Sequence, residues 1–561
     1  MLDADVLIVG AGSAGAVLAA RLSENPSTRV LLVEAGPDTA PDAVPADISD
    51  VFPSSSLNHA YFWPGLQAQR TPGGPLYPFP QARIMGGGSS IMGMWALRGV
   101  PNDFASWRAA GADGWDAADA VRVYRTFEND LDRDMSQRSS AAPYTIRRAP
   151  RSEWPLFAEA FQRAAIAEGL PIVEDINEST GDAFFPMPVA QSTTERSSSA
   201  SAYLTAAVRR RPNLQIMTET LVNAIRFEGG KATGATVTRA GEEQSIRARE
   251  VILSAGAIHS PAMLIRSGIG PEGQVRNIGV TPVAVRAGVG QRLQNHAYLN
   301  IALTLPRSSR QNQALRNFAL AGIRLSSGLA DCPPTDMLVF LIGRVSARAW
   351  GPSVAMVGAG LYAPYSRGQV TVSSPDAGIH PHVSFGLMSD PRDAPRMIKA
   401  ARFAENLLFR AETYSLFHDA FLLPPVMALD QFNKPGLRGA LLGQAAKMVL
   451  DAPSAMSRAV LNRMLRPGRW IGNRSGRLAL TDEEILAAIA PMGHVTSTCS
   501  IGREDDPMAV VDSACRVYGV GSLRVVDASI MPSVPSANTN LTTIMVAERA
   551  AELIAAAAGV S

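Results

Sequence analysis

Residues 5–34 read DVLIVGAGSAGAVLAARLSENPSTRVLLVE, and this stretch decides the fold. A short apolar, β-branched run precedes a glycine-rich turn, which leads into an Ala- and Leu-rich segment with helical spacing that ends at Leu22. A second apolar run, residues 30–34, follows and ends in Glu34. This order predicts a β-α-β unit with the glycine-rich turn between its first strand and its helix.

The turn carries a pattern that is typical of dinucleotide sites. Gly10, Gly12 and Gly15 give GxGxxG, and Glu34 stands 19 residues after Gly15. The glycines permit a tight turn and bring backbone N–H groups close to a pyrophosphate, whose negative charge the helix N-terminus favours. Glu34 can accept hydrogen bonds from the adenosine ribose hydroxyls. The pattern alone does not distinguish FAD from NAD.

Composition and charge exclude several classes of protein. The chain has 561 residues, 46% of them apolar, so we expect two lobes with ample core. Its 52 basic and 50 acidic residues nearly cancel, which leaves no global field to attract nucleic acid. Cys332, Cys499 and Cys515 have neither disulfide nor zinc spacing. With no targeting segment or long apolar span in the sequence, we expect a cytoplasmic protein without a metal ion.

Strand-like runs recur far along the chain. One at 250–254 leads into a helical segment, and residues 523–526 form another. The Pro-, Ser- and Gly-rich region 37–80 is predicted to be a long, partly looped excursion. Between about residues 291 and 490, alternating strands such as 368–372 mix with helices. We therefore expect a discontinuous nucleotide-binding lobe and a separate substrate lobe.

Further motifs make the chain resemble the glucose-methanol-choline (GMC) oxidoreductases. Residues 82–94, ARIMGGGSSIMGM, resemble the first signature of that family, and residues 256–270, GAIHSPAMLIRSGIG, fit its second signature at every restricted position. Shorter segments follow in the order and spacing of the family, at 494–499, 509–512, 524–529 and 538–540. The resemblance implies an α/β, two-lobed fold with a Rossmann-like FAD-binding lobe and a substrate lobe built on a mainly antiparallel sheet with helices.

The resemblance also divides the chain into two domains. We expect residues 1–150, 205–290 and 491–561 to form a discontinuous FAD-binding domain. Residues 151–204 and 291–490 are expected to form the substrate-binding domain. Both domains would therefore be assembled from segments that are distant in sequence.

By the same resemblance, a set of residues is expected to contact FAD. The glycine-rich turn at 86–89 would pass near the isoalloxazine, since glycine lets backbone donors approach a flat ring. Val222 would meet the adenine, and Asp527 with Ala528 would meet the pyrophosphate or the ribityl chain. The full set is Gly10, Gly12, Ser13, Ala14, Gly15, Glu34, Ala35, Arg83, Gly87, Gly88, Ser89, Ile91, Met92, Gly93, Met94, Val222, Ala255, Asp527, Ala528, Asn538, Thr539 and Asn540.

The first signature departs from the family at positions near the flavin. Met85 stands where the family has a branched aliphatic residue, and Met92 stands where it has Asn or His. The loss of a polar contact at Met92 favours a dehydrogenase over an oxidase, with oxygen or a quinone-like carrier as acceptor. Some members attach FAD covalently to a histidine. This chain has Ile91 at that position, so the resemblance implies non-covalent FAD.

The implied reaction is the oxidation of an alcohol. A base removes the hydroxyl proton while hydride leaves the carbinol carbon for flavin N5, and a neutral imidazole suits this role near pH 7. His494 stands at the position of the family's catalytic histidine, and Asn538 stands at the partner position, where its amide can donate to the developing alkoxide. No motif identifies the alcohol, and a primary, aromatic one is our expectation.

Three alternatives stay open at this point. A hydroxynitrile lyase on the same flavoprotein fold would use the histidine as acid and base in redox-neutral cyanohydrin cleavage. A light-driven decarboxylase would not need His494 with Asn538. A non-enzymatic FAD-binding protein would need neither residue.

Residues 434–469 look like an insertion before the catalytic segment. They hold seven basic residues against Asp451, a net formal charge of +6 in a chain whose total is +2. Apolar residues recur at helical spacing on both sides of 451–453, so we expect two short amphipathic helices. One hypothesis is a hairpin packed on the substrate lobe with its basic face in water. The other is peripheral contact with anionic lipid.

Overall fold

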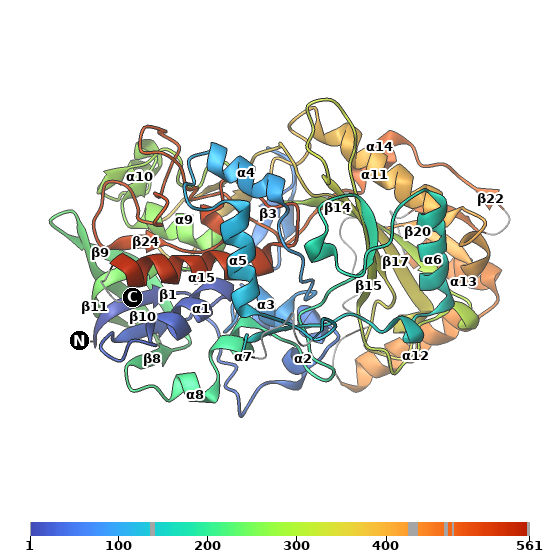
Figure 1. The fold of residues 1–561 in the computed structure, drawn as a ribbon, viewed down its shortest axis with the longest axis horizontal. Helices are drawn as coiled ribbons and strands as arrows, with labels where there is room; N and C mark the ends of the chain where they lie inside the picture. Colours follow the sequence, from blue (N-terminus) through green and yellow to red (C-terminus); the bar gives the residue numbers. More distant parts are fainter. Residues whose placement is uncertain are drawn as a thin grey trace.

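The structure is a computed structural model that describes residues 2–134, 141–424, 433, 436–464, 469–473 and 476–557. It is built on two large sheets, one in each half of the molecule (Figure 1). Elements from near both ends of the chain lie together in the half drawn on the left of Figure 1. The fold is α/β with two lobes, as the sequence predicted.

The first sheet has the strand order β8-β2-β1-β11-β10-β9, with β24 beside β11. β8, β2, β1, β11 and β24 are parallel neighbours, whereas β10 is antiparallel to β9 and β11. The bounds are β1 (Leu2–Val9), β2 (Val30–Val33), β8 (Leu214–Met217), β9 (Thr220–Glu228), β10 (Lys231–Arg239), β11 (Glu242–Leu253) and β24 (Leu523–Val525). Residues 6–9 and 30–33 are buried, which explains their continuous apolar sequence.

The β-α-β unit predicted at the N-terminus consists of β1, α1 (Ser13–Leu22) and β2. Helix α1 packs against the C-terminal helix α15 (Thr539–Ala557), so the two ends of the chain meet beside this sheet. The strand predicted at 250–254 is the end of the longer strand β11. Its first half, from residue 242 to residue 247, pairs with β10 and was missed because it is largely polar and exposed.

The second sheet is antiparallel throughout, in the order β22-β21-β20-β14-β17-β16-β15-β7, with β23 beside β14. One face packs against α6 (Leu156–Ala167) and α11 (Asp393–Leu408), and together they enclose the core of this half. Its strands are β7 (Ala183–Pro186), β14 (Ala297–Thr304), β15 (Ala319–Leu325), β16 (Met337–Ile342), β17 (Val354–Leu361), β20 (Asp419–Leu422), β21 (Arg469–Asn473), β22 (Gly476–Arg477) and β23 (Ala490–Pro491).

A smaller, four-stranded sheet joins the predicted excursion to the middle of the chain. Its order is β18-β19-β3-β4, and its bounds are β3 (Gln67–Gln69), β4 (Leu76–Pro78), β18 (Gln369–Thr371) and β19 (His382–Ser384). Other helices are α2 (Ala46–Ser49), α3 (Gly88–Ile91), α4 (Pro101–Ala109), α5 (Ala117–Phe127), α7 (Ser199–Tyr203), α8 (Ala206–Arg209), α9 (Gly256–Arg266), α10 (Glu272–Asn277) and α14 (Asp482–Ala487).

The basic insertion contains the two helices that its periodicity predicts. They are α12 (Leu437–Asp451) and α13 (Ser454–Met464), with the break at the predicted place. Lys434 and Arg466 of the insertion lie outside the described residues. Across the described part of the chain, no helix is long and apolar enough to cross a membrane.

Gly15 is a position where a side chain has no room. A Cβ there would come 1.8 Å from the carbonyl oxygen of Gly10, so helix α1 approaches the turn only because the residue is glycine. We expect Gly15→Ala to lower the free energy of unfolding by about 1–3 kcal/mol or more, as overpacking does. Gly181→Ala is the control, because a Cβ at Gly181 meets nothing within 4 Å. Thermal unfolding checks this, and equal Tm values for the two variants would contradict it.

Candidate active site

A cavity of about 730 Å³ takes its wall from both large sheets. From the first sheet, the wall receives the ends of β1 and β2, the turns after β11 and β24, and the N-terminus of α1. From the second sheet, it receives residues of β14, β16 and β17. Ligands of open α/β sheets bind beyond the carboxyl ends of the parallel strands, and the first part of this cavity has that position.

Glu34 follows β2 and turns its carboxylate towards the glycine-rich turn. Its Oε2 accepts from the backbone N–H of Ala11 at 2.8 Å, and its Oε1 accepts from that of Gly36 at 2.8 Å. Burial raises the pKa of Glu34, and these two bonds oppose the shift. Each carboxylate oxygen has a further lone pair, so Glu34 can still accept from a ribose hydroxyl.

Two glycine turns touch each other beneath the cavity. Gly86 donates its N–H to the carbonyl of Ala11 at 2.7 Å, and a Cβ on Gly87, whose φ is 55°, would come 2.9 Å from the Cα of Gly12. Gly12 is the N-cap of α1 and offers no side-chain cap, so the positive end of the helix borders the cavity. This backbone cradle fits the pyrophosphate and the flat ring of FAD.

A buried arginine holds the turn that follows the second glycine cluster. The guanidinium of Arg196 donates to the carbonyls of Met92 at 2.7 Å, Ser89 at 3.2 Å and Ile48 at 3.1 Å. Burial lowers the pKa of Arg196 to about 10, so the group stays charged at neutral pH. Arg196 could not be predicted from the sequence, because a single arginine in a Ser-rich stretch carries no pattern.

Most residues of the expected cofactor set line the cavity. They are Gly10, Gly12, Ser13, Ala14, Glu34, Ala35, Gly87, Gly88, Ser89, Met92, Gly93, Met94, Val222, Ala255, Asp527, Ala528, Asn538, Thr539 and Asn540. Gly15, Arg83 and Ile91 lie behind the wall. Arg83 donates to the carbonyl of Ala35 at 3.1 Å, and Ile91 is fully buried in a small apolar core. These three residues support the wall rather than form it.

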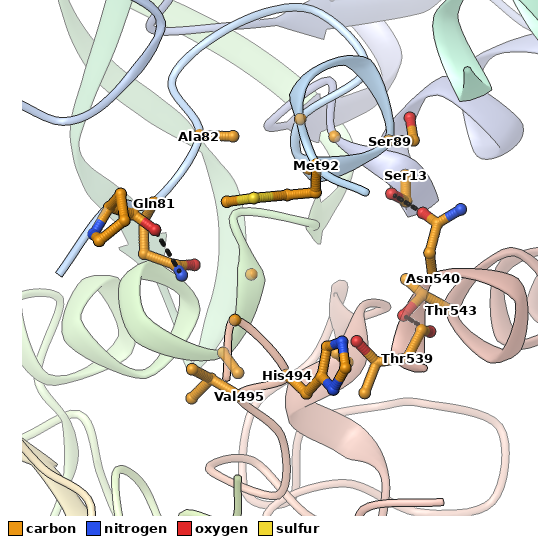
Figure 2. A pocket seen from close by; sticks show the side chains of 18 of the residues that line it. Ser13, Gln81, Ala82, Ser89, Met92, His494, Val495, Thr539, Asn540 and Thr543 are labelled. Atoms are coloured by element: carbon orange, nitrogen blue, oxygen red, sulfur yellow. Dashed lines mark hydrogen bonds between the residues drawn. The ribbon is translucent and has the colours of Figure 1, made fainter. Parts of the chain in front are cut away.

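His494 and Asn538 meet at the cavity. The Nδ2 of Asn538 lies 3.1 Å from the Nε2 of His494, and the Nδ1 of His494 lies 2.8 Å from the Nδ1 of His296. The Nε2 of His296 lies 3.0 Å from the carbonyl oxygen of Pro535. Figure 2 shows His494 on one side of the cavity and Met92 on the opposite side. Asn295 also accepts from the backbone N–H of His494 at 3.1 Å.

These contacts fix the tautomers of both imidazoles. A carbonyl only accepts, so the Nε2 of His296 carries a proton and, in the neutral ring, its Nδ1 is an acceptor. His494 must then donate from Nδ1, so its Nε2 is unprotonated and its lone pair accepts from the Nδ2 of Asn538. The sequence analysis assigned no role to His296, because it lies 198 residues before His494 and outside any motif. Only the fold brings the two rings together.

Tyr362 sets the orientation of the Asn538 amide. Its hydroxyl donates to the Oδ1 of Asn538 at 3.2 Å, so the Nδ2 points at His494. The ring of Tyr362 stacks on that of His296, with 4.3 Å between centroids and 23° between planes. No sequence signal marked Tyr362. One tyrosine thus positions both partners of His494.

Burial decides the charge state of the pair of imidazoles. It lowers the pKa of His494 to about 4 and the pKa of His296 well below its ordinary value. Both rings are therefore neutral at pH 7. His494 presents an unprotonated Nε2 to the cavity, which is the state that a general base requires.

Two other expected cofactor residues have protein partners. Asn540 accepts from the hydroxyl of Ser13 at 2.6 Å and donates to the hydroxyl of Tyr144 at 2.7 Å, so it ties α15 to α1 (Figure 2). The Oδ2 of Asp527 accepts from the N–H of Gly256 at 2.9 Å and from the hydroxyl of Ser260 at 2.5 Å. Both side chains are fixed before any ligand binds.

The wall from the second sheet is apolar and aromatic. Alternate residues of its strands face the cavity, and Trp95 meets Phe340 edge to face at 4.7 Å. The wall residues from the second sheet are Tyr298, Asn300, Phe340, Ile342 and Met356, and Trp95 and Phe318, which lie outside its strands, complete the wall. Among the described residues that line the cavity, the carboxylates are Glu34 and Asp527, both on the side of the first sheet. In the described part of the chain, no cluster of His, Cys, Asp and Glu could hold a metal ion.

Residues 4–298 and 364–547 match the N-terminal and C-terminal parts of the family described as GMC oxidoreductase. The chain belongs to the GMC oxidoreductase family. The 5-(hydroxymethyl)furfural oxidase of Methylovorus sp. (strain MP688) is 37% identical over 568 residues, which cover 98% of each chain. The oxygen-dependent choline dehydrogenase of Sinorhizobium medicae (strain WSM419) is 31% identical over 99% of this chain and 96% of its own. Pyridoxine 4-oxidase from Mesorbium loti has a TM-score of 0.77 and 26% identity, with 98% of each chain covered.

Membership confirms three predictions from the sequence. The chain is an FAD-dependent alcohol oxidoreductase, it has the two-lobed fold of GMC enzymes, and it acts on a small molecule. The relatives named above are oxidases or dehydrogenases, and none of them is a lyase.

His296 offers a test of the tautomer argument. In His296→Leu, the Nδ1–H of His494 loses its acceptor, so we expect flavin reduction by substrate to slow by about 10- to 100-fold, as when an orienting group is lost. In His296→Gln, an amide oxygen can still accept from His494, so most of the rate should remain. Anaerobic stopped-flow measurements over a pH series check this. Equal rates for His296→Leu and the wild type at every pH would contradict it.

Proposed function

We propose that this enzyme oxidises a neutral, aromatic primary alcohol, with His494 as the general base and Asn538 as its partner. The observation that carries the proposal is the tautomer of His494. Its Nδ1 donates to His296, so its Nε2 carries no proton. A substrate hydroxyl that takes the place of the Asn538 amide at this nitrogen can give its proton to it. FAD, when bound, supplies the acceptor of the hydride.

The residues around His494 have separate roles in the proposed reaction. The Nδ2 of Asn538 donates to the Nε2 of His494 in this structure, and it can turn this N–H to a substrate oxygen bound there and stabilise that oxygen as it loses its proton. Tyr362 keeps this amide in the correct orientation. Because the pKa of His494 is lowered, the proton that it takes is readily released to solvent or to the next acceptor.

The wall of the second sheet supports an aromatic and uncharged substrate. A ring would stack or meet edge to face with Trp95, Tyr298 and Phe340, which surround the apolar part of the cavity. A quaternary ammonium would have no carboxylate on this side of the cavity to offset its charge. The relative that oxidises 5-(hydroxymethyl)furfural therefore suggests a better substrate than the choline dehydrogenases do.

The domain assignment also stays a proposal. We infer that residues 1–150, 205–290 and 491–561 bind the cofactor and that 151–204 and 291–490 bind the substrate. This division is supported by the two large sheets, because the strands of the first sheet come from the first set of segments and those of the second sheet come almost entirely from the second set. Helix α7, within 151–204, packs against α1, which argues for ending that segment a few residues earlier.

Met92 and the relatives point to different electron acceptors. Met92 lines the cavity, and we expected it to favour a dehydrogenase. The relatives include an oxidase and an oxygen-dependent dehydrogenase, so we propose molecular oxygen as the acceptor rather than a quinone-like carrier. The cytoplasmic location also remains a proposal.

Anaerobic reduction of the bound flavin tests the proposed reaction. We expect 5-(hydroxymethyl)furfural to reduce it at least about 100-fold faster than choline does, since an unpaired charge is costly to bury. His494→Ala should slow the reduction by about 100-fold or more, and Asn538→Ala should slow it less, because water can replace one donor. His382→Ala, an exposed histidine in β19, is the control. A wild-type rate in flavin-loaded His494→Ala would refute the role of this residue.

The attachment of the cofactor is tested by denaturation. Ile91 is apolar and buried behind the cavity wall, so it offers no atom for a covalent bond to FAD. We expect acid or heat to release all of the flavin into the supernatant, where absorbance quantifies it against the protein. Flavin that stays with the precipitated chain would show a covalent bond at another residue.

A further inference from the structure

Helices α12 and α13 expose an apolar ridge. Leu437, Leu441 and Met448 of α12 are 86%, 70% and 69% exposed, and Met456 of α13 is 58% exposed, the four highest values among large apolar side chains in the described part of the chain. The three residues of α12 are spaced by four and seven, so they lie along one side of the helix. We call these four residues the apolar ridge.

The opposite side of α12 is the one that packs on the protein. Gly439, Gly443 and Leu450 are buried, and a Cβ on Gly443 would come 3.1 Å from the side chain of Arg348 and 3.3 Å from that of Trp350. The hairpin is therefore seated by these two glycines and Leu450, whereas Leu437, Leu441 and Met448 point to solvent. Figure 1 shows α12 and α13 at the outer edge of the half that holds the second sheet.

Two of the basic residues that we expected on a face in water pair with carboxylates instead, whereas Arg438 and Arg463 are exposed. Lys447 donates to Asp451 at 2.6 Å, and Arg458 donates to Asp419 at 2.7 Å. Asp451 also accepts from Arg310 at 2.6 Å, and this is the acid that the sequence analysis noted as lone. The buried or half-buried carboxylates draw these cations inward, which leaves the outer side to Leu and Met.

Two cations remain beside the ridge. Arg438 precedes Leu441 by three residues on α12, and Arg463 follows Met456 by seven residues on α13, so each lies on the side of its helix that carries an exposed apolar side chain. Neither arginine forms an ion pair with any residue that the structure describes. The exposed residues of α12 and α13 include no Asp or Glu, so the outer side of the hairpin carries charge of one sign only.

We propose that the α12–α13 hairpin docks the enzyme on an anionic lipid surface. A helix that lies in the membrane interface buries an apolar side among the acyl chains and keeps cations at the level of the headgroups. The apolar ridge supplies the first part, and Arg438 and Arg463 supply the second. An anionic surface is complementary to this charge, whereas a hairpin that only covered the protein would have its apolar side inward.

Vesicle co-sedimentation of the flavin-loaded enzyme tests the proposal. We expect binding to vesicles that contain phosphatidylglycerol, little binding to pure phosphatidylcholine, and release at about 0.5 M salt, where charges are screened. Leu437→Ser/Leu441→Ser/Met448→Ser should weaken binding by about tenfold or more, and Arg438→Gln/Arg463→Gln should remove the preference for anionic lipid. Alcohol oxidation in solution should be unchanged in both variants.

The control is Val285→Ser, which replaces an apolar residue of comparable exposure, 56%, outside the hairpin. It should bind vesicles as the wild type does. The proposal is overturned if the wild type does not bind anionic vesicles at low salt, or if the triple serine variant binds equally well. It is also overturned if light scattering shows a wild-type dimer that the triple serine variant alone dissolves, because the ridge is then covered by a second copy of the chain.

Discussion

Two imidazoles that meet nitrogen to nitrogen form the constraint on which the site depends. The 2.8 Å contact between the Nδ1 atoms of His296 and His494 is stable only if one of them donates, and the carbonyl of Pro535 decides which. His296 immediately precedes β14 of the second sheet, whereas His494 and Pro535 belong to the C-terminal part of the chain. The contact therefore joins the second sheet, which carries the apolar wall, to the C-terminal segment that carries the base. A movement of this segment relative to the second sheet would break the contact.

Buried charges hold the segments that carry this arrangement. Asp103 accepts from the N–H and the hydroxyl of Ser536 at 2.8 Å each, two residues before Asn538, and burial raises the pKa of Asp103 to about 6. The guanidinium of Arg196 donates to the backbone carbonyl of Met92. Each charge is costly to bury, and each is compensated mainly by backbone or hydroxyl groups. Such groups fix a loop more strictly than apolar packing would, because their hydrogen bonds have direction.

The parts that the sequence could predict are those carried by local patterns. The β-α-β unit, the glycine turns and the helical hairpin each lie within a few tens of residues, and His494 and Asn538 stood in short family motifs. His296, Tyr362 and Arg196 were out of reach, because each contributes through a contact between distant segments. The sequence also could not show which cations of the hairpin are paired, since Lys447 of α12 meets Asp451 and Arg458 of α13 meets the distant Asp419.

Residues alternate along the strands of the second sheet, so that one set packs in the core with α11 and the other set faces the cavity. On β14, Ala297, Leu299, Ile301 and Leu303 pack into the core with α11, while Tyr298 and Asn300 face the cavity. Gly358 of β17 makes room for the ring of Phe340 opposite it, since a Cβ there would come 2.0 Å from that ring. The cavity-facing residues Phe340 and Ile342 are buried in the other core, whereas His296 immediately precedes β14 and His494 follows β23. The residues that shape the cavity and the residue that takes the proton therefore lie on different elements.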